Sequence, residues 1–389
     1  MYKRVLLIVL DGVGVGALPD AAAYGDEDAA TLQHVAAGVG GMHLPQLEGL
    51  GLGHIVPLAG VTPVRQPLAS WGKMAEQSVG KDSVTGHWEL AGIVLQRPFA
   101  SYPAGFPVEI IDLFTAIAGI KPLGNRAASG TDVLRDLGEE HLRSKRPIVY
   151  TSTDSVFQIA GHEDIIPPAR LYELCSATFD ALRPYNICRV IARPFRGESS
   201  ATFYRTNGRH DFSCLPPDET LLDQLHKNGI PTCGIGKIGD LFAGRGLTQS
   251  IPTSDNRMGM AEILSALDQF PTGLIMANLV DFDMVYGHRL DVEGFAAALV
   301  EFDQWLVQLL PRLERDDLLV ITADHGCDPT TPGTDHTREY VPLLAYSPAL
   351  SKTKNLGVRD SFADLGATLA ENFGLECRTG KSFLANLGD

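Results

Sequence analysis

Short apolar runs recur in the first and last parts of the chain, and several of them are followed closely by Asp or Gly. They are rich in β-branched residues, as expected of strands buried on both faces. The runs lie at 5–10, 230–235, 274–280, 318–321 and 341–346. Because helical patterns separate several of them, the sequence predicts an α/β core with a mostly parallel sheet flanked by helices.

Four segments carry apolar residues at helical spacing and supply the predicted helices of this core. They lie at 219–227, 258–270, 295–313 and 362–373. The third joins the runs at 274–280 and 318–321 into a βαβ unit. A right-handed crossover of this kind leaves both strands ending at the same edge of the sheet.

The composition changes between residues 97 and 214. Prolines punctuate this segment, and short helical patterns alternate with strand-like runs at 148–152 and 189–192. We expect an inserted α+β domain at 97–214, which divides the core into the two pieces 1–96 and 215–389.

Charge and composition narrow the classes of function. The chain has 389 residues, 44% of them hydrophobic, and 32 Lys plus Arg against 47 Asp plus Glu give a net charge of −15. A nucleic-acid partner is not expected, since phosphate backbones need a cationic surface. An anionic substrate stays compatible, because bound divalent metal ions can supply positive charge.

The apolar segments and the cysteines indicate the cellular compartment. The apolar run at 5–10 is too short for a signal peptide and ends in an acid, and no other segment is long enough to span a bilayer. The six cysteines are scattered without a CxxC pair. We therefore expect a soluble cytoplasmic protein with reduced thiols and no membrane partner, in which Cys327 is a bystander of the nearby candidate site.

Carboxylates and histidines gather where three predicted strands end. Acids follow the runs at 5–10, 274–280 and 318–321, and parallel strands deliver such residues to one edge of the sheet. Asp and His are hard-to-borderline ligands. Six of them exceed what one zinc ion usually takes from protein, and they suit two divalent ions, Mn²⁺, Mg²⁺ or Zn²⁺. The candidates are Asp11, Asp283, His288, Asp324, His325 and His336.

Two glycine-containing stretches carry further candidate chemistry. The stretch at 11–16 is a poor match to a dinucleotide-binding loop and is better described as a strand end. The stretch at 78–92 holds Ser83 and Thr85, and the segment after Thr85 can open a helix. A hydroxyl there either caps the helix or carries a phosphoryl group in its positive field. Two metal ions favour phosphoryl or sulfuryl transfer, with Thr85 as the nucleophile.

The motifs that hold these residues resemble, essentially end to end, the phosphopentomutases of the alkaline-phosphatase-like metalloenzyme superfamily. The DHG and DHT motifs with GHR are typical of the superfamily, whereas GKDSVTGHWE and YTSTDSVFQIA are more specific to the family. Further matching stretches are VLDGVGVG, RVIARPF, GIGKIGD and NLVDFDMVYGHRLD. The resemblance implies a phosphatase-like α/β core interrupted by a cap domain.

The resemblance also implies an assignment of the site. One Mn²⁺ would be held by Asp11, Asp324 and His325, and the other by Asp283, His288 and His336. Thr85 would carry a phosphoryl group between ribose or deoxyribose 1-phosphate and the 5-phosphate, through a 1,5-bisphosphate. A hexose bisphosphate of the glucose 1,6-bisphosphate type would prime the enzyme.

Substrate contacts implied by the resemblance are Asp154, Lys237 and Arg193. Arg189 could replace Arg193, and Ser83 offers a second hydroxyl near Thr85. The partner is a sugar phosphate, while the oligomeric state stays open and a monomer is compatible with the sequence.

Three other functions are compatible with parts of this pattern. A phosphatase or sulfatase of the same superfamily would keep all six ligands, and only the cap with Asp154 argues against it. A metal-dependent phosphoglycerate mutase usually has a serine nucleophile, which Thr85 contradicts. A metal-stabilised binding protein would not need an open hydroxyl beside six ligands.

Overall fold

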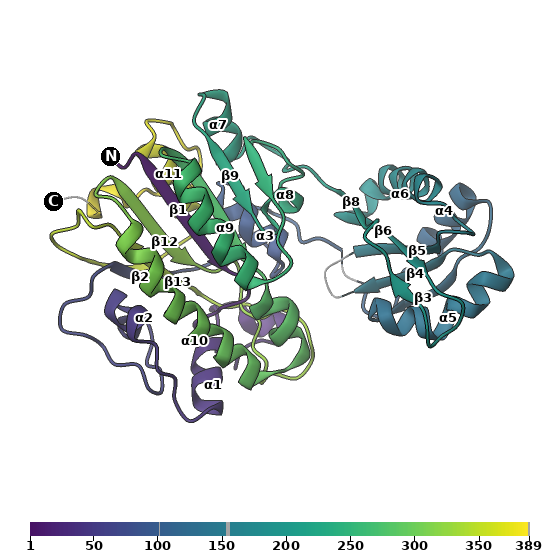
Figure 1. Cartoon of the computed structure of the whole chain (residues 1–389), viewed down its shortest axis with the longest axis horizontal. Helices are drawn as coiled ribbons and strands as arrows, with labels where there is room; N and C mark the ends of the chain where they lie inside the picture. Colours follow the sequence, from purple (N-terminus) through teal and green to yellow (C-terminus); the bar gives the residue numbers. More distant parts are fainter. Residues whose placement is uncertain (101, 153–155, 388–389) are drawn as a thin grey trace. The chain divides into compact units, whose positions relative to one another are not determined.

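The computed structural model describes residues 1–100, 102–152 and 156–387, and the chain divides into two compact units. Unit 1 joins Met1–Arg97 to Leu215–Asp389, and unit 2 is Pro98–Cys214 (Figure 1). Unit 2 therefore starts one residue after the composition change that the sequence shows at 97.

An eight-stranded sheet lies at the centre of unit 1, in the order β10-β9-β11-β1-β12-β13-β2-β14. β13 pairs antiparallel with both of its neighbours, whereas the other described pairs in this sheet are parallel. Every residue of β1, β11 and β12 is buried, which explains why their sequences are mostly apolar. In chain order the strands are β1 (Arg4–Leu10), β2 (Ser70–Met74), β9 (Thr232–Ile235), β10 (Gln249–Ile251), β11 (Gly273–Leu279), β12 (Asp317–Thr322), β13 (Val341–Tyr346) and β14 (Asn355–Arg359).

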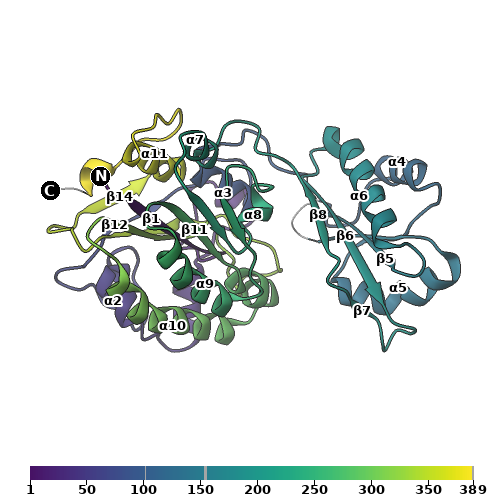
Figure 2. The same ribbon diagram turned by 45° about the horizontal axis from the view of Figure 1, so that its top comes forward.

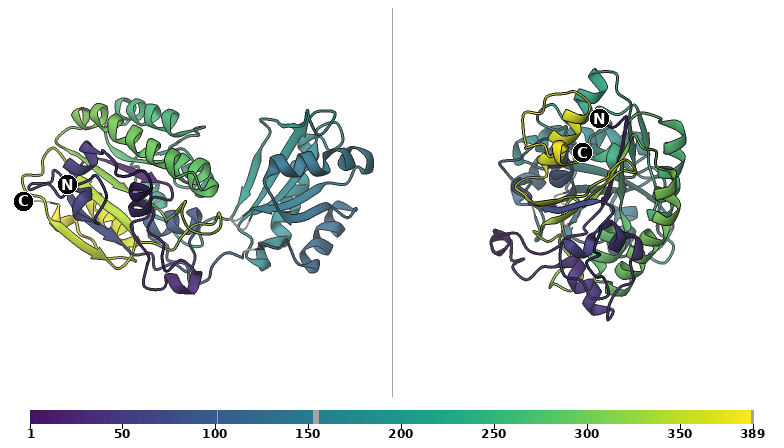
Figure 3. Two further views of the ribbon diagram at one scale, coloured as in Figure 1. Left: turned by 90° about the horizontal axis from the view of Figure 1, so that it is seen from below. Right: turned by 90° about the vertical axis from the view of Figure 1, so that its left-hand side faces the viewer.

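Helices cover both faces of this sheet, so the prediction of a mostly parallel sheet flanked by helices is confirmed. Figure 2 shows α2, α9 and α10 on one side and α3, α7 and α11 on the other. The green helices of Figure 3, α9 and α10, run together along one face. The helices are α1 (Thr31–Gly38), α2 (Pro45–Leu50), α3 (Ser83–Leu90), α7 (Leu221–Lys227), α8 (Ile238–Leu241), α9 (Asn256–Gln269), α10 (Val292–Leu309) and α11 (Ala363–Asn372).

The register of the central strands fixes where their carboxyl ends lie. Leu10 of β1 pairs with Leu279 of β11, and Val9 pairs with Thr322 of β12. The residues that follow these three strands therefore leave the sheet at the same level. This is the edge at which the sequence places its carboxylates.

Unit 2 has a sheet of its own, in the order β3-β4-β5-β6-β7, with β8 also paired to β6. One buried cluster packs α4 and α6 against the sheet around Phe114, Phe157 and Leu171, and a second lies under α5 around Val133 and Phe195. The elements are α4 (Val108–Ala118), β3 (Leu123–Ala127), α5 (Gly130–Ser144), β4 (Ile148–Ser152), β5 (Val156–His162), α6 (Pro168–Leu182), β6 (Arg189–Arg196), β7 (Tyr204–Arg205) and β8 (His210–Ser213).

A buried ion pair joins β1 and β12 at their amino ends, opposite the edge that carries the carboxylates. The Arg4 guanidinium donates to both carboxylate oxygens of Asp317, at 2.9 and 2.5 Å. It also donates to the carbonyls of Leu267 and Phe270, at 2.6 and 3.1 Å. Arg4 and Asp317 are only 5% and 4% exposed, so neither charge has water as an alternative partner.

We predict that Arg4→Met destabilises unit 1 by about 3 to 5 kcal/mol, because it leaves the Asp317 carboxylate buried without its partner. The measurement is chemical unfolding of the two proteins at neutral pH. Lys3→Met is the matched control, since Lys3 pairs with Asp316 at 2.6 Å while their side chains are 69% and 53% exposed. Equal unfolding curves for Arg4→Met and Lys3→Met would contradict the stabilising role of the buried pair.

Candidate metal centre

Three buried carboxylates stand at the carboxyl edge of the central sheet. Asp11 directly follows β1, Asp324 lies two residues beyond β12, and Asp283 lies in a π-helical turn, Phe282–Tyr286, beyond β11. Asp11 and Asp324 are fully buried and Asp283 is 2% exposed. Asp283 is thus carried by a π turn, which is wider than an α-helical turn.

A first group of ligand atoms forms around Asp11, Asp324 and His325. The His325 Nε2 atom lies 3.2 Å from Asp11 Oδ1 and 3.3 Å from Asp324 Oδ2. His325 Nδ1 lies 3.0 Å from the Gly326 carbonyl, which can only accept, so Nδ1 carries the proton of the neutral ring. Nε2 is therefore the atom that would give up its proton and bind a cation placed between His325 and the two carboxylates.

A second group forms around Asp283. Its Oδ1 atom lies 3.3 Å from His288 Nε2 and 3.2 Å from His336 Nε2. His288 Nδ1 donates to the Thr334 carbonyl at 2.7 Å, which again leaves Nε2 as the ligand atom. The His325 and His336 rings are 4.1 Å apart between centroids, so the two groups adjoin.

The donor atoms fit divalent cations. Asp283 Oδ1 and Asp324 Oδ2 are buried and accept no hydrogen bond from any described residue. A buried carboxylate oxygen without a donor is costly, and a bound cation would remove that cost. All six sequence-predicted ligands lie in these two groups, and their nitrogen and oxygen atoms suit Mn²⁺, Mg²⁺ or Zn²⁺.

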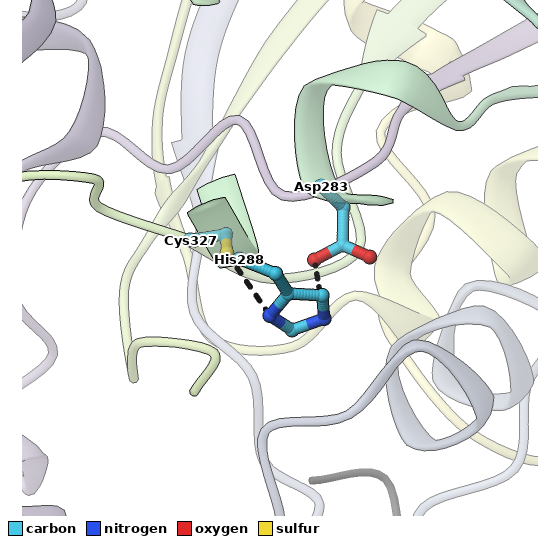
Figure 4. A group of neighbouring side chains, drawn as sticks. All are labelled: Asp283, His288 and Cys327. Atoms are coloured by element: carbon cyan, nitrogen blue, oxygen red, sulfur yellow. Dashed lines mark hydrogen bonds and ion pairs between the residues drawn. The ribbon is translucent and has the colours of Figure 1, made fainter. Parts of the chain in front are cut away.

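Cys327 also lies beside the second group, within 4.8 Å of ligand atoms of Asp283 and His288. Figure 4 shows the His288 ring between Cys327 and Asp283. The Cys327 thiol lies 3.9 Å from His288 Nδ1, whereas the carboxylate faces Nε2. Cys327 is thus close enough to be a third ligand beside Asp283 and His288, and the bystander role expected from the sequence stays a prediction.

The candidate nucleophile lies on the first turn of α3. This helix begins at Ser83 and not after Thr85, and Asp82 caps it by accepting from the backbone amides of Val84 and Thr85. The buried Thr85 hydroxyl donates to Asp82 Oδ2 at 2.6 Å. Ser83 Oγ lies 3.1 Å from His325 Nε2 and 3.4 Å from Asp11 Oδ1. Ser83 thus contacts ligands of the first group directly, whereas the Thr85 hydroxyl, on the same turn of α3, is held by Asp82, which is also the helix cap.

Gly86 allows α3 to approach the metal ligands. A Cβ atom at this position would stand 2.1 Å from the Asp324 carbonyl oxygen, which is backbone and cannot swing aside. The missing side chain therefore sets the distance between the hydroxyl-bearing turn and the end of β12.

Comparison with known proteins places the chain in a family. The model of the metalloenzyme superfamily matches residues 3–377. The phosphopentomutase of Syntrophotalea carbinolica is 58% identical over 386 residues, which are 99% of this chain and 98% of that protein. The phosphopentomutase of Caldanaerobacter subterraneus is 53% identical over 389 residues, 100% of this chain and 98% of that protein. The chain belongs to the phosphopentomutase family.

Membership in the phosphopentomutase family makes the chain an isomerase of the metalloenzyme superfamily. Among solved structures, the PH0037 protein from Pyrococcus horikoshii aligns with a TM-score of 0.50 at 13% identity, over 96% of this chain and 98% of that one. This likeness concerns the fold. Within the described residues, no helix combines the length and the apolar character needed to cross a bilayer.

Lys237 brings a positive charge to the same edge. It lies between β9 and the short helix α8. Its Nζ atom is 2.9 Å from Asp11 Oδ2 and 3.8 Å from Asp283 Oδ2, and its side chain is 27% exposed. The lysine therefore faces both carboxylates while part of it still reaches solvent.

These charges determine how the centre is ionised. Burial favours a raised pKa for Asp11, but the Lys237 and His325 charges outweigh it and hold that pKa below the ordinary value. Burial is likewise outweighed at Asp283, where the neighbouring imidazoles lower the pKa. The pKa of His325 lies well above normal, because Asp324 and Asp11 overcome its burial. The acids are thus carboxylates, ready to hold cations.

Several buried residues of the centre were not singled out from the sequence. His87 Nδ1 lies 2.8 Å from the Ser83 carbonyl and 3.0 Å from Asp324 Oδ2. Arg338 donates to Glu76 and to the carbonyl of Gly80, both at 2.7 Å. His87 lies two residues after Thr85 in the sequence, and Arg338 lies two residues after His336. This closeness to predicted site residues is the feature of the sequence that could have identified them.

The substrate contacts predicted in unit 2 lie on β6 or outside the described residues. Arg193, on β6, is half-buried and donates from Nε to Gln158 at 3.0 Å, and burial lowers its pKa to about 10. Arg189 lies 3.7 Å from Asp211, so this alternative contact already has an acidic partner. Asp154 lies outside the described residues.

We predict that Gly86→Ala weakens the binding of divalent cations and destabilises unit 1 by about 1 to 3 kcal/mol, because the methyl group forces α3 away from Asp324. Isothermal titration with Mn²⁺ and thermal unfolding measure the two effects. The matched control is Gly49→Ala on α2, where an added Cβ meets nothing within 4 Å. Unchanged Mn²⁺ affinity in Gly86→Ala would contradict the close approach of α3.

Proposed function

We propose that the chain interconverts α-D-ribose 1-phosphate, or 2-deoxyribose 1-phosphate, with the corresponding 5-phosphate. The supporting observation is identity of 51 to 58% with named phosphopentomutases over nearly the whole chain. The centre agrees chemically, since it gathers carboxylates, imidazoles and a hydroxyl at one sheet edge. We further propose a cytoplasmic enzyme of nucleoside catabolism.

Two Mn²⁺ ions are the proposed cofactors, with Mg²⁺ or another divalent ion as a substitute. Asp11, Asp324 and His325 would hold one, and Asp283, His288 and His336 the other. When bound, the ions would neutralise phosphoryl oxygens and stabilise an ionised hydroxyl at Thr85.

Thr85 is the proposed carrier of the phosphoryl group. Phospho-Thr85 gives its phosphoryl group to the free hydroxyl of a pentose monophosphate, which forms the 1,5-bisphosphate and regenerates the Thr85 hydroxyl. The bisphosphate then returns its other phosphoryl group to Thr85 and leaves as the isomeric monophosphate. A hexose bisphosphate of the glucose 1,6-bisphosphate type would phosphorylate Thr85 at the start.

The surroundings of Thr85 support this role. Asp82 accepts the hydroxyl proton at 2.6 Å, and this hydrogen bond ends once the oxygen is phosphorylated. The amino end of α3 then offers its backbone dipole to the phosphate. Asp82 thus orients the free Thr85 hydroxyl, and the amino end of α3 stabilises the phosphorylated form of Thr85.

Substrate binding is proposed for Lys237, Asp154 and Arg193. Lys237 is suited to a phosphate because its ammonium group already faces two carboxylates of the centre. Asp154 would contact a ribose hydroxyl, and Arg193 a phosphate from unit 2, the proposed cap. A cap of this kind would exclude water while the bisphosphate reorients.

A phosphatase of the same superfamily is the alternative function. It would use the same metal ligands and release phosphate to water. The near full-length relatives named phosphopentomutase do not favour it.

Thr85→Ala should abolish conversion of ribose 1-phosphate to ribose 5-phosphate while two equivalents of Mn²⁺ still bind, because the ligands are unchanged. A coupled assay and metal analysis of the same sample measure both. In Ser83→Ala, turnover should fall, since Ser83 touches His325 and Asp11, but phosphate should still form on Thr85. Wild-type turnover in Thr85→Ala would remove this residue from the mechanism.

Lys237→Met should raise the KM for the sugar phosphate by roughly tenfold or more, as expected for loss of a charge-assisted contact of about 1.5 to 3 kcal/mol. Steady-state kinetics with saturating Mn²⁺ measure it. Lys227→Met is the matched control, since Lys227, the last residue of α7, is exposed and pairs with Glu219, which precedes the helix. A KM equal to that of the control would exclude Lys237 as a phosphate contact.

A further inference from the structure

Two cysteines of unit 2 stand opposite each other across neighbouring antiparallel strands. β6 and β8 pair Arg189 with Ser213, and one step further along the same register Cys188 faces Cys214. The backbone amide of Cys214 donates to the Cys188 carbonyl at 2.8 Å, so the ladder continues through this pair.

The side chains of the pair point to the same face of the sheet. Side chains alternate between faces along a strand, so Cys188 shares its face with Val190, and Cys214 shares its face with Phe212. Val190 and Phe212 both pack in the same apolar cluster. The Cys214 thiol lies 3.9 Å from the carbonyl of Ile187, the residue before Cys188. Directly opposed residues in antiparallel strands have Cα atoms about 4.5 to 5.5 Å apart, a spacing that a disulfide can bridge.

The two thiols differ in exposure and in reactivity. Cys188 is 4% exposed, whereas Cys214 is partly exposed. The hydrogen bond from Cys188 and the nearby Arg183 charge lower the pKa of Cys214 despite its burial. Burial raises the pKa of Cys233, in unit 1, to about 11. Cys214 is therefore the better nucleophile of the pair and Cys188 the adjacent second thiol.

We propose that Cys188 and Cys214 are a reversible oxidation site that forms a disulfide with small disulfides of the glutathione class. The Cys214 thiolate attacks one sulfur of oxidised glutathione, which forms a mixed disulfide and releases one glutathione thiolate. Cys188, after losing its proton to solvent, attacks the Cys214 sulfur and displaces the second glutathione. Two protein thiols are oxidised and one glutathione disulfide is reduced to two thiols.

The position of the pair gives the modification a structural consequence. Cys214 is the last residue of unit 2, and the chain continues into unit 1 at Leu215. A disulfide to Cys188 would fasten this end of the connection to β6. The reduced connection is held there by the β-ladder hydrogen bond and the weak thiol contact.

The test uses the full chain with Mn²⁺ bound, treated with oxidised glutathione without denaturant, then alkylated and mapped by peptide mass spectrometry. We expect a cross-linked peptide pair joining Cys188 to Cys214, which dithiothreitol separates. In Cys188→Ser the reaction should stop at glutathione on Cys214. Cys377→Ser, which removes another partly exposed thiol, should cross-link as the wild type does.

A second measurement, the unfolding temperature, detects the disulfide independently and shows whether the variants fold. The unfolding temperature of the wild type should rise on oxidation, and that of Cys188→Ser should not, because only the wild type gains a cross-link. If Cys188→Ser fails to fold, Cys188→Ala serves in its place. Recovery of both residues as separately alkylated thiols, or a stable mixed disulfide on wild-type Cys214, would overturn the proposal. Neither result depends on mutase activity.

Discussion

The burial of three carboxylates at one sheet edge is the constraint on which the rest of the site depends. Asp11, Asp283 and Asp324 are almost completely withdrawn from water, and they lie together because β1, β11 and β12 end at the same level. Such a cluster of anions is stable only with cations beside it. Lys237 and the imidazoles supply part of that charge, and the oxygens left without donors indicate where divalent ions complete it.

The sequence predicted this edge because local pattern and topology agree there. An apolar run followed by an acid can be recognised in the sequence alone. The rule that βαβ crossovers are right-handed then predicts that two such strands end at the same edge of the sheet. The six proposed ligands could be selected in this way, and the structure brings all of them within one centre. The resemblance of the motifs then added the reaction, which spacing alone does not contain.

What the sequence did not predict depends on contacts between distant segments or on weak local patterns. β2 and β14 lack a long apolar run, since they lie toward the sheet's edge and are only partly buried. The role of Arg338 depends on carbonyls more than 250 positions away, which no local pattern reveals. The beginning of α3 was misplaced because Ser83, Thr85 and Asp82 are all good cap residues, and only the geometry selects Asp82.

The central claim is that the buried metal centre serves a phosphoryl group carried by Thr85. The most direct test is phosphopeptide mapping of the Mn²⁺-loaded protein before and after incubation with glucose 1,6-bisphosphate, with conversion of ribose 1-phosphate followed in parallel. Phosphate on Thr85 should rise with priming and track the rate of isomerisation. Phosphate accumulating in solution, with no phosphothreonine on the chain, would contradict it and favour the hydrolase.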